Sequence, residues 1–297
     1  MRFEKWQALG NDYVILEREE LPFELTPARV RRLCEGHFGI FADGILLLSP
    51  PADGEHVADL RIFNPDGSEA ELSGNGVREA VLYLRRRGWT EQREFAIHTP
   101  AGTVRPTITG PDTCRVDMGR ASLTSPDFPG GPLDGRGEIL LDGRVWRFRH
   151  VSIGNPQCAI RVDSERELDA LDLASIGPPI EADSRFPNRT NVSWYAALEQ
   201  DGPGARDGPG ARIRARIFER GVGETLSSGT GATGAAVAHV CGQPAGRRPA
   251  IVTVVLDGGE LTVEVGEGLD VNLTGWARSV FEGRITDDFA KELHETE

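Results

Sequence analysis

A chain of 297 residues with 39% hydrophobic residues is long enough to form two hydrophobic cores, so we expect two domains. The formal net charge of −13 argues against a nucleic-acid or anionic-membrane partner, which would normally require a basic surface. The N-terminus lacks the apolar core of a signal peptide, and no apolar run is long enough to cross a bilayer. Four scattered cysteines without C-x-x-C spacing indicate buried thiols of a reducing compartment, so we expect a cytoplasmic protein.

Lysine is rare in this chain, where only Lys5 and Lys291 occur, both near the termini. A pyridoxal phosphate enzyme needs an internal lysine for its Schiff base, and neither residue suits that role. The six histidines have no ligand spacing, and the sequence contains no P-loop, G-x-S-x-G or H-E-x-x-H motif. We therefore expect neither a cofactor nor a bound metal.

The predicted elements, in chain order, are mostly short strands with few helices. Alternating polarity, β-branched residues and Asp-Gly or Gly-Gly turns predict the strands. They are expected at residues 14–19, 58–64, 93–99, 103–109, 114–119, 138–154, 158–163, 191–198, 212–221, 251–257, 260–266 and 270–275. A first helix is predicted at about 27–36, because Thr26 and Pro27 fit the N-cap and first-turn positions. The pattern is typical of an antiparallel-rich α+β fold.

Two further helices are predicted directly after a repeated motif. Residues 69–76 read EAELSGNG and residues 224–231 read ETLSSGTG, so both match E-x-x-x-S-G-[NT]-G. The helix predicted at 77–87 has apolar residues at i, i+3, i+4 and i+7, and the helix predicted at 232–241 is apolar nearly all round, as in a helix buried inside a sheet. One motif and one helix in each half indicate the duplication of a single unit.

Two other patterns are interpreted as structural. Residues 201–212 form a tandem hexapeptide, DGPGARDGPGAR, which predicts a flexible insertion in a hairpin because glycine and proline at this density cannot join a strand ladder. Residues 229–234 match G-x-G-x-x-G, but the strands predicted after them resemble a hairpin and not part of a βαβ crossover, so we predict no dinucleotide site.

The repeated motif suits the binding of a carboxylate. Glycines at a helix start let backbone N–H groups approach a ligand, and the amides of the first turn bind anions. Two such starts facing each other would hold one carboxylate, with Ser73 and Ser228 on opposite sides. In a racemase or epimerase, one group removes a proton and the other returns it from the far face. The alternative is that both serines are only N-caps, a position that serine commonly fills.

Seven blocks of this sequence resemble the diaminopimelate epimerase family, cofactor-independent enzymes of lysine and peptidoglycan precursor synthesis. They are residues 9–16, 39–48, 63–78, 151–160, 189–194, 218–232 and 275–285. The resemblance implies two pseudo-symmetric domains, each a mostly antiparallel sheet wrapped round a central helix, with an amino-acid substrate in the cleft between them. We expect one domain at 1–120 together with 274–297 and the other at 121–273. The resemblance also implies a homodimer.

Carried over position by position, the resemblance implies a complete set of substrate contacts. Arg220 is expected to bind a distal carboxylate in bidentate fashion and Glu219 to pair with an ammonium group. The asparagines expected at the remote end of the substrate are Asn11, Asn64, Asn155 and Asn191. The backbone amides expected to hold the reacting carboxylate belong to Gly74, Asn75, Gly229 and Thr230.

The sequence departs from the family where the chemistry is expected. The family has cysteine, its acid–base group, at the positions of Ser73 and Ser228. A cysteine thiol, whose pKa is ordinarily about 8.5, becomes a thiolate at a helix N-terminus, whereas an alkyl hydroxyl is a far weaker acid that needs an adjacent base. Two lesser differences are Glu79, where a second cysteine is common, and Gln157, where histidine usually follows the Asn-Pro pair.

Three functions are open at this point. The first is an amino-acid epimerase that interconverts LL- and meso-diaminopimelate by two-base proton transfer through Ser73 and Ser228. The second is another isomerase, in which one carboxylate among Glu79, Glu69 and Glu224 carries a proton along one face of the substrate. The third is a non-catalytic ligand-binding homologue. The complete contact set favours the first function.

Overall fold

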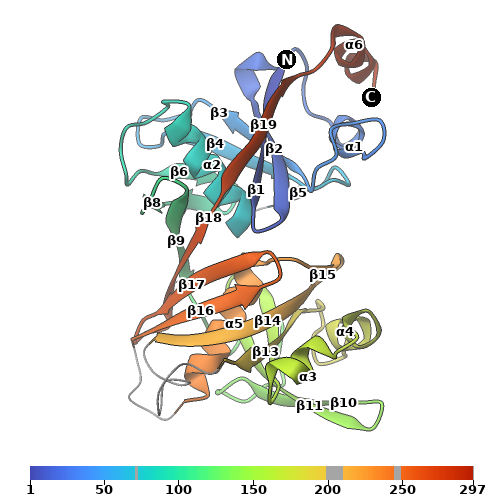
Figure 1. Ribbon diagram of the computed structural model, residues 1–297, viewed down its shortest axis with the longest axis vertical. Coiled ribbons are helices and arrows are strands. Elements are labelled where there is room, and N and C mark those ends of the chain that lie inside the picture. The colour runs from blue at the N-terminus through green and yellow to red at the C-terminus, as the bar shows by residue number, and fades with distance from the viewer. Residues whose placement is uncertain (71–72, 199–209, 244–248, 297) are drawn as a thin grey trace. The chain divides into compact units, whose positions relative to one another are not determined.

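The computed structural model describes the chain except for residues 71–72, 199–209, 244–248 and 297. It divides into two compact units, of which the first comprises Met1–Val116 with Gly275–Glu297 and the second comprises Asp117–Thr274. Each unit is built on strands that pack against one long helix, which is an α+β architecture (Figure 1). The chain passes between the units along β9 (Thr113–Arg120) and β18 (Asp270–Trp276).

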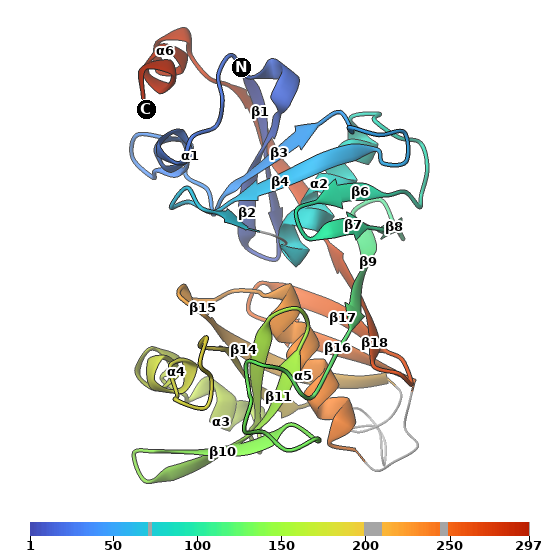
Figure 2. The ribbon, with the colours of Figure 1, turned by 180° about the vertical axis from the view of Figure 1, so that it is seen from behind.

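The sheet of the first unit has the strand order β19-β1-β2-β3-β4-β6-β7, with β5 paired to β4. The central helix α2 (Gly74–Arg86) contacts β1, β2, β3 and β19 and is buried from Asn75 to Leu84 (Figure 2). The other elements are β1 (Arg2–Ala8), β2 (Asn11–Glu17), η1 (Arg18–Glu20), α1 (Pro27–Cys34), β3 (Ile45–Ser49), β4 (Ala58–Phe63), β5 (Glu69–Ala70), β6 (Ile97–Thr99), β7 (Gly102–Val104), β8 (Thr107–Ile108), β19 (Arg278–Arg284) and α6 (Asp287–Glu295).

The sheet of the second unit contains the order β10-β11-β12-β13-β14-β16-β17-β18, with β15 paired to β14. Its central helix α5 (Gly229–Cys241) contacts β11, β12, β13, β14, β16 and β17, and nearly all of its residues are buried. The other elements are β10 (Arg136–Leu141), β11 (Arg144–Ser152), β12 (Pro156–Arg161), α3 (Glu165–Asp169), α4 (Leu173–Glu181), β13 (Asn191–Ala197), β14 (Gly210–Glu219), β15 (Gly223–Thr225), β16 (Ala250–Leu256) and β17 (Gly259–Val265).

The two units share one order of connections, as the predicted duplication requires. In the first, β2 and β3 are parallel, β4 turns back into β5, and α2 then leads to β6, which lies parallel to β4. In the second, β12 and β13 are parallel, β14 turns back into β15, and α5 leads to β16, which lies parallel to β14. The expectation that no crossover follows residues 229–234 is therefore wrong, although β16 and β17 do form the predicted hairpin.

Most helix predictions are confirmed, with corrected boundaries. Both central helices begin earlier than predicted because the glycines of the repeated motif form their first turns, at Gly74 and Gly229. The helix predicted at 27–36 ends at Cys34. Helices α3, α4 and α6 have no counterpart in the prediction. The strands that flank the tandem hexapeptide, β13 and β14, are antiparallel, while residues 199–209 lie outside the described residues.

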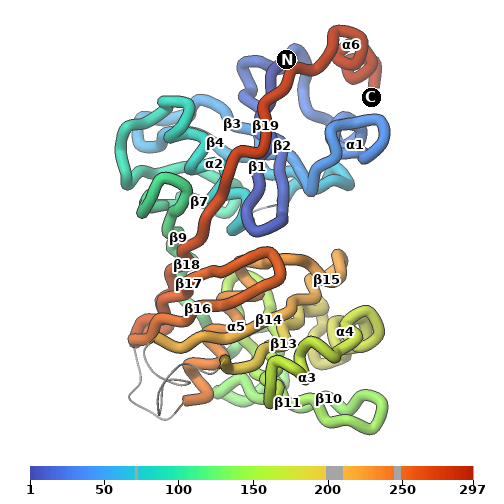
Figure 3. Tube along the Cα trace, in the orientation of Figure 1, coloured from blue at the N-terminus to red at the C-terminus, as the bar shows by residue number. Residues whose placement is uncertain are grey.

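The C-terminal segment returns to the first residues of the chain (Figure 3). Its helix α6 contacts α1, where Arg29 Nε donates to the carbonyl of Leu293 at 2.7 Å and Arg32 Nε pairs with Glu292 at the same distance. Among the described residues, no helix is long and apolar enough to cross a membrane.

Candidate active site

The half-site of the first unit begins at Ser73, the N-cap of α2. Its Oγ accepts the backbone N–H of Gly76 at 3.1 Å, and its carbonyl accepts the first helical hydrogen bond, from Val77, at 2.8 Å. The backbone N–H groups of Gly74 and Asn75 come before Val77 in the chain and lie at the positive end of the helix dipole. The N-cap role considered for Ser73 is thus confirmed, and it places the side chain beside the first amides of the helix.

A chain of hydrogen bonds fixes the side chains beside this helix start. Arg78, which is fully buried, donates to Asn75 Oδ1 at 2.6 Å and to the carbonyl of Gly74 at 3.0 Å. Asn75 Nδ2 donates to Asn11 Oδ1 at 3.0 Å, and Asn11 Nδ2 donates to Asp43 at 2.8 Å. Two residues of the expected contact set, Asn11 and Asn75, therefore touch each other.

Asn64 occupies a turn of its own in the first unit. Its Nδ2 donates to Ser68 Oγ at 3.0 Å, and its carbonyl accepts the N–H of Gly67 at 2.9 Å. No hydrogen bond between Asn64 and either Asn11 or Asn75 is present among the described residues. A turn-forming role accounts for these contacts, and its part in substrate binding stays a prediction.

The half-site of the second unit repeats the N-cap and adds a carboxylate. Ser228 Oγ accepts the N–H of Gly231 at 3.2 Å and donates to Glu219 Oε2 at 2.9 Å. Thr225 Oγ1 donates to the other oxygen of Glu219, also at 2.9 Å. Burial raises the pKa of Glu219 above its ordinary value, and the two hydroxyl donors oppose part of that rise. A buried serine hydroxyl thus donates to a carboxylate that retains its proton to a higher pH than an ordinary glutamate.

The other expected contacts of the second unit form two local groups. Asn155 donates to Thr230 Oγ1 at 3.4 Å and accepts from Gln157 Nε2 at 2.7 Å. Gln157, at the position where the resemblance implies histidine, thus contacts Asn155, a predicted substrate contact. Asn191 Oδ1 accepts the backbone N–H of Arg220 at 2.9 Å. The guanidinium of Arg220 donates to the carbonyl of Asn188 at 2.8 Å.

Glu181, at the end of α4, is a buried residue that the sequence analysis missed. Its carboxylate accepts the N–H of Gly221 at 2.8 Å and pairs with Arg189 at 2.5 Å. Gly221 has a φ of +77°, which a side chain would disfavour, so this turn is fixed on both sides of Arg220. The only signal in the sequence was a carboxylate at the end of an otherwise apolar segment.

Replacing Glu181 with leucine is expected to weaken substrate binding about tenfold, because the Gly221 amide loses its acceptor and the loop carrying Arg220 loosens. The Glu181→Gln variant keeps an acceptor oxygen and serves as the matched control. Isothermal calorimetry on both variants measures the effect. Wild-type affinity in the Glu181→Leu variant would contradict a role of this side chain in holding the loop.

The carboxylates Glu69 and Glu224, at the same position of the two motifs, are held in ion pairs. Arg61 binds Glu69 through two hydrogen bonds of 2.7 and 2.8 Å, and Arg216 Nε donates to Glu224 at 2.8 Å. The Arg61 guanidinium lowers the pKa of Glu69, which opposes proton uptake. These pairs join β4 to β5 and β14 to β15, so they serve the hairpins that precede each motif rather than a proton shuttle.

Glu79 lies one turn into α2 and is fully buried. Neither carboxyl oxygen makes a hydrogen bond of normal geometry to a described residue. Burial raises its pKa well above the ordinary value, nearby Asp12 and Asp43 add to the rise, and Arg78 and the Tyr13 amide oppose it. Burial therefore favours the protonated, neutral form of this side chain.

The Glu79→Met variant is expected to have an unfolding free energy about 1–3 kcal/mol higher than the wild type, since it removes a buried carboxyl group that lacks hydrogen bonds of normal geometry. The difference in unfolding free energy between Glu79→Met and the wild type should increase with pH. The contribution of Glu79 to stability is present below its unfolded pKa and is lost as pH rises through the raised folded pKa. Denaturant unfolding at acidic and alkaline pH measures this. A Glu79→Gln variant keeps polar atoms at this position. It should lose the pH dependence of the unfolding free energy without the gain in stability expected of Glu79→Met.

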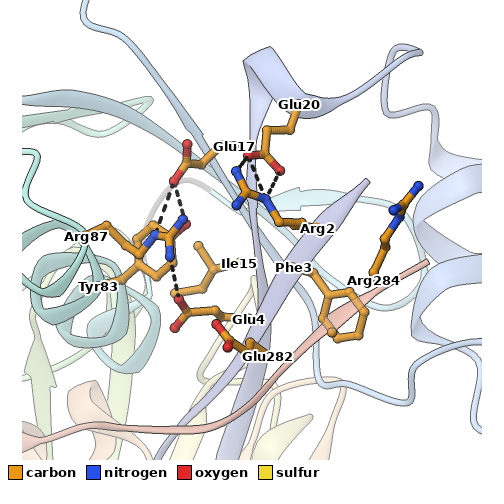
Figure 4. A pocket seen from close by; sticks show the side chains of 11 residues that line it. Arg2, Phe3, Glu4, Ile15, Glu17, Glu20, Tyr83, Arg87, Glu282 and Arg284 are labelled. Atoms are coloured by element: carbon orange, nitrogen blue, oxygen red, sulfur yellow. Dashed lines mark hydrogen bonds and ion pairs between the residues drawn. The ribbon is translucent and has the colours of Figure 1, made fainter.

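A cavity of about 300 Å³ in the first unit lies at the opposite end of α2 from Ser73 (Figure 4). Tyr83 donates to Glu17 there at 2.6 Å, and Arg87 lies 3.7 Å from Glu4 and 4.0 Å from Glu17. The thirteen residues of α2 span about 20 Å, so this cavity is distinct from the helix start. Within the described part of the chain, no group of His, Cys, Asp and Glu side chains could hold a metal ion.

Comparison with known proteins identifies the family. A family model described as "Diaminopimelate epimerase" matches residues 3–124 and 149–277. The chain belongs to the diaminopimelate epimerase family. Relatives include the diaminopimelate epimerase of Pelotomaculum thermopropionicum, which is 40% identical over 95% of this chain and 98% of its own length. The diaminopimelate epimerase of Alkalilimnicola ehrlichii is 38% identical over 97% of this chain and 99% of its own length.

Solved structures of more distant proteins share the fold of this diaminopimelate epimerase family member. A Bacillus anthracis phenazine biosynthesis protein of the PhzF family has a TM-score of 0.68 at 18% identity and covers 96% of this chain and 99% of its own. A hydroxyproline epimerase from Agrobacterium vitis has a TM-score of 0.62 at 16% identity, covering 97% and 93%. The resemblance seen in the seven sequence blocks is confirmed, and with it the isomerase class.

Proposed function

We propose that this protein is a cofactor-independent epimerase that interconverts LL- and meso-diaminopimelate, with Ser73 and Ser228 as its two acid–base groups. The observation that carries the proposal is the 2.9 Å hydrogen bond from Ser228 Oγ to Glu219. An alkyl hydroxyl removes a proton from carbon only if a base accepts the hydroxyl proton, and Glu219 is such a base. The serine that replaces cysteine therefore has the partner that its chemistry requires.

The helix starts supply the electrostatic part of the mechanism. In the proposal, the amides of Gly74, Asn75, Gly229 and Thr230 bind the carboxylate next to the reacting carbon. Loss of the α-proton moves negative charge onto the carboxylate oxygens. Preorganised N–H donors and helix dipoles stabilise that charge more than they stabilise the ground state. The same groups thus bind the substrate and lower the barrier.

The distal end of the substrate is assigned to the remaining contacts. Arg220, whose backbone is held by Asn191 and whose loop is anchored by Glu181, binds the second carboxylate. Its guanidinium would exchange the Asn188 carbonyl for that carboxylate. Asn11, Asn64, Asn155 and Asn191 orient the distal zwitterion through their amides.

A non-catalytic ligand-binding protein is the second candidate function. It is favoured by one observation, which is that the described partners of Ser73 Oγ are a phenol and a backbone amide and include no carboxylate or imidazole. The single-carboxylate isomerase is disfavoured, because Glu69 and Glu224 are ion-paired and Glu79 is enclosed.

The test is to incubate the purified protein with LL- and with meso-diaminopimelate in D2O and to follow the α-proton by NMR. The proposal expects deuterium at the α-carbon together with a change of configuration. Saturable binding by calorimetry with no exchange would overturn it in favour of the non-catalytic protein. Neither binding nor exchange would point to another substrate.

We further propose a cytoplasmic homodimer. The four cysteines are free thiols, which suits a reducing compartment. Strand β19 is the edge of its sheet and exposes Val280 and Phe281, which are 55% and 44% accessible. An edge strand with apolar side chains is suited to antiparallel pairing with a second copy about a two-fold axis. Sedimentation of wild type and a Phe281→Arg variant tests this, and a monomeric wild type would overturn it.

A further inference from the structure

Tyr13, on β2, contacts the proposed acid–base group of the first unit. Its hydroxyl donates to Ser73 Oγ at 3.2 Å. The ring is buried and packs closely on Gly44, where an added Cβ would lie 2.7 Å from Tyr13 Cε1. Because the glycine leaves no room for the ring to shift toward it, the phenol is fixed in position beside the N-cap.

The hydrogen bonds of the two serines differ in direction. Ser73 Oγ accepts both from Tyr13 and from the Gly76 amide, so neither bond uses its own hydroxyl proton. Ser228 Oγ accepts from the Gly231 amide and donates its proton to Glu219. Two donors onto Ser73 stabilise negative charge on its oxygen, as develops when it gives up a proton. The carboxylate beside Ser228 instead withdraws the hydroxyl proton, which favours proton uptake from carbon.

We propose that Tyr13 is a positioning residue that supplies a proton to Ser73, so that in the resting protein Ser73 is the proton donor and Ser228 the proton acceptor. The inference rests on the proposed epimerase function and deepens it. It assigns a role to a residue outside the expected contact set and makes the two serines unequal.

The proton balance of one turnover follows from these contacts. The Cα–H bond breaks and its proton passes to Ser228 Oγ, while the Ser228 hydroxyl proton passes to Glu219. A new Cα–H bond forms on the other face with the Ser73 proton, which the Tyr13 phenol replaces. Glu219 ends protonated and Tyr13 ends as a phenolate, and exchange with water restores both. A phenol is a much stronger acid than an alkyl alcohol, so Tyr13 spares Ser73 from remaining an alkoxide.

Tyr13→Phe removes only the hydroxyl and keeps the ring over Gly44. We expect kcat for epimerisation to fall about 10²-fold, within the usual range for acid–base assistance, with KM unchanged because the Tyr13 hydroxyl is directed to Ser73 and lies outside the expected contact set. Tyr83→Phe is the matched control, since its hydroxyl bonds to Glu17 at the far end of α2. Thermal melting verifies that both variants are folded. A wild type active on both stereoisomers with an unchanged Tyr13→Phe variant would overturn this inference and leave the proposed function standing, whereas an inactive wild type would overturn both.

A double-mutant cycle separates proton supply from packing. In the Ser73→Cys background, Tyr13→Phe should have little effect on kcat, because a thiolate is stable without a phenol proton. If Tyr13 only supports the local structure, its loss should cost the same factor in both backgrounds. Equal losses would therefore overturn the inference.

Discussion

Replacing Ser73 and Ser228 together with cysteine is expected to accelerate α-proton exchange by about 10²- to 10⁴-fold over the wild type. Both positions are N-caps, with their side chains accepting the amides of Gly76 and Gly231 at 3.1 and 3.2 Å. A helix N-terminus lowers the pKa of a thiol toward neutrality, so each cysteine would ionise without a separate base. The hydroxyls remain protonated there and depend on Tyr13 and Glu219.

Alanine at each position is the complementary loss experiment. Ser73→Ala and Ser228→Ala should each abolish epimerisation while diaminopimelate still binds, because the helix-start amides are backbone groups. Quenched-flow or NMR exchange rates and calorimetric affinities measure both properties on the same samples. A double cysteine variant no faster than wild type would mean that the hydroxyl is not what limits the rate, and activity in either alanine variant would remove that serine from the chemistry.

The elements of the fold that local chemistry determines were predictable from the sequence. The apolar periodicity at 77–87 and the nearly all-apolar segment at 232–241 predict both central helices, but the predicted starts are too late because glycine has a low intrinsic helix propensity. The parallel pairing of β14 with β16 was missed, because strand direction depends on how the helix packs back onto the sheet. Local sequence carries little information about such pairings.

The candidate site was predictable as a list of residues but not as a set of contacts. Ser228 and Glu219 lie nine positions apart and meet because the β14–β15 turn brings the strand end back to the helix start. Tyr13 and Ser73 lie sixty positions apart and meet only through the packing of α2 on β2. The resemblance implies that Glu219 is an ammonium ligand, and the structure adds a contact with the Ser228 hydroxyl that no sequence pattern indicated.

Glu219→Gln is expected to reduce kcat by about 10²-fold or more, because an amide cannot accept the Ser228 proton. The substituted side chain is nearly isosteric, and its single amide oxygen can accept from one of Thr225 and Ser228 while its NH2 group donates to the other hydroxyl. Glu224→Gln is the matched control, since that carboxylate lies on the adjacent strand in an ion pair with Arg216. If both variants lose activity equally, the effect belongs to the hairpin and not to proton acceptance.

The pH dependence gives the sharper test of Glu219, because activity and stability should respond in opposite directions. Burial raises its pKa above 4.5, so the rate should climb as pH rises through that raised value and frees the carboxylate to accept a proton. The folded state holds the carboxyl proton more tightly than the unfolded chain, so its stabilising contribution is lost over the same rise in pH. In the wild type, the rate should rise and the unfolding free energy should fall as pH increases across this interval. In Glu219→Gln, the rise in rate and the fall in unfolding free energy over this pH interval should both disappear. A rate that still rises over the same interval would assign the base to another group.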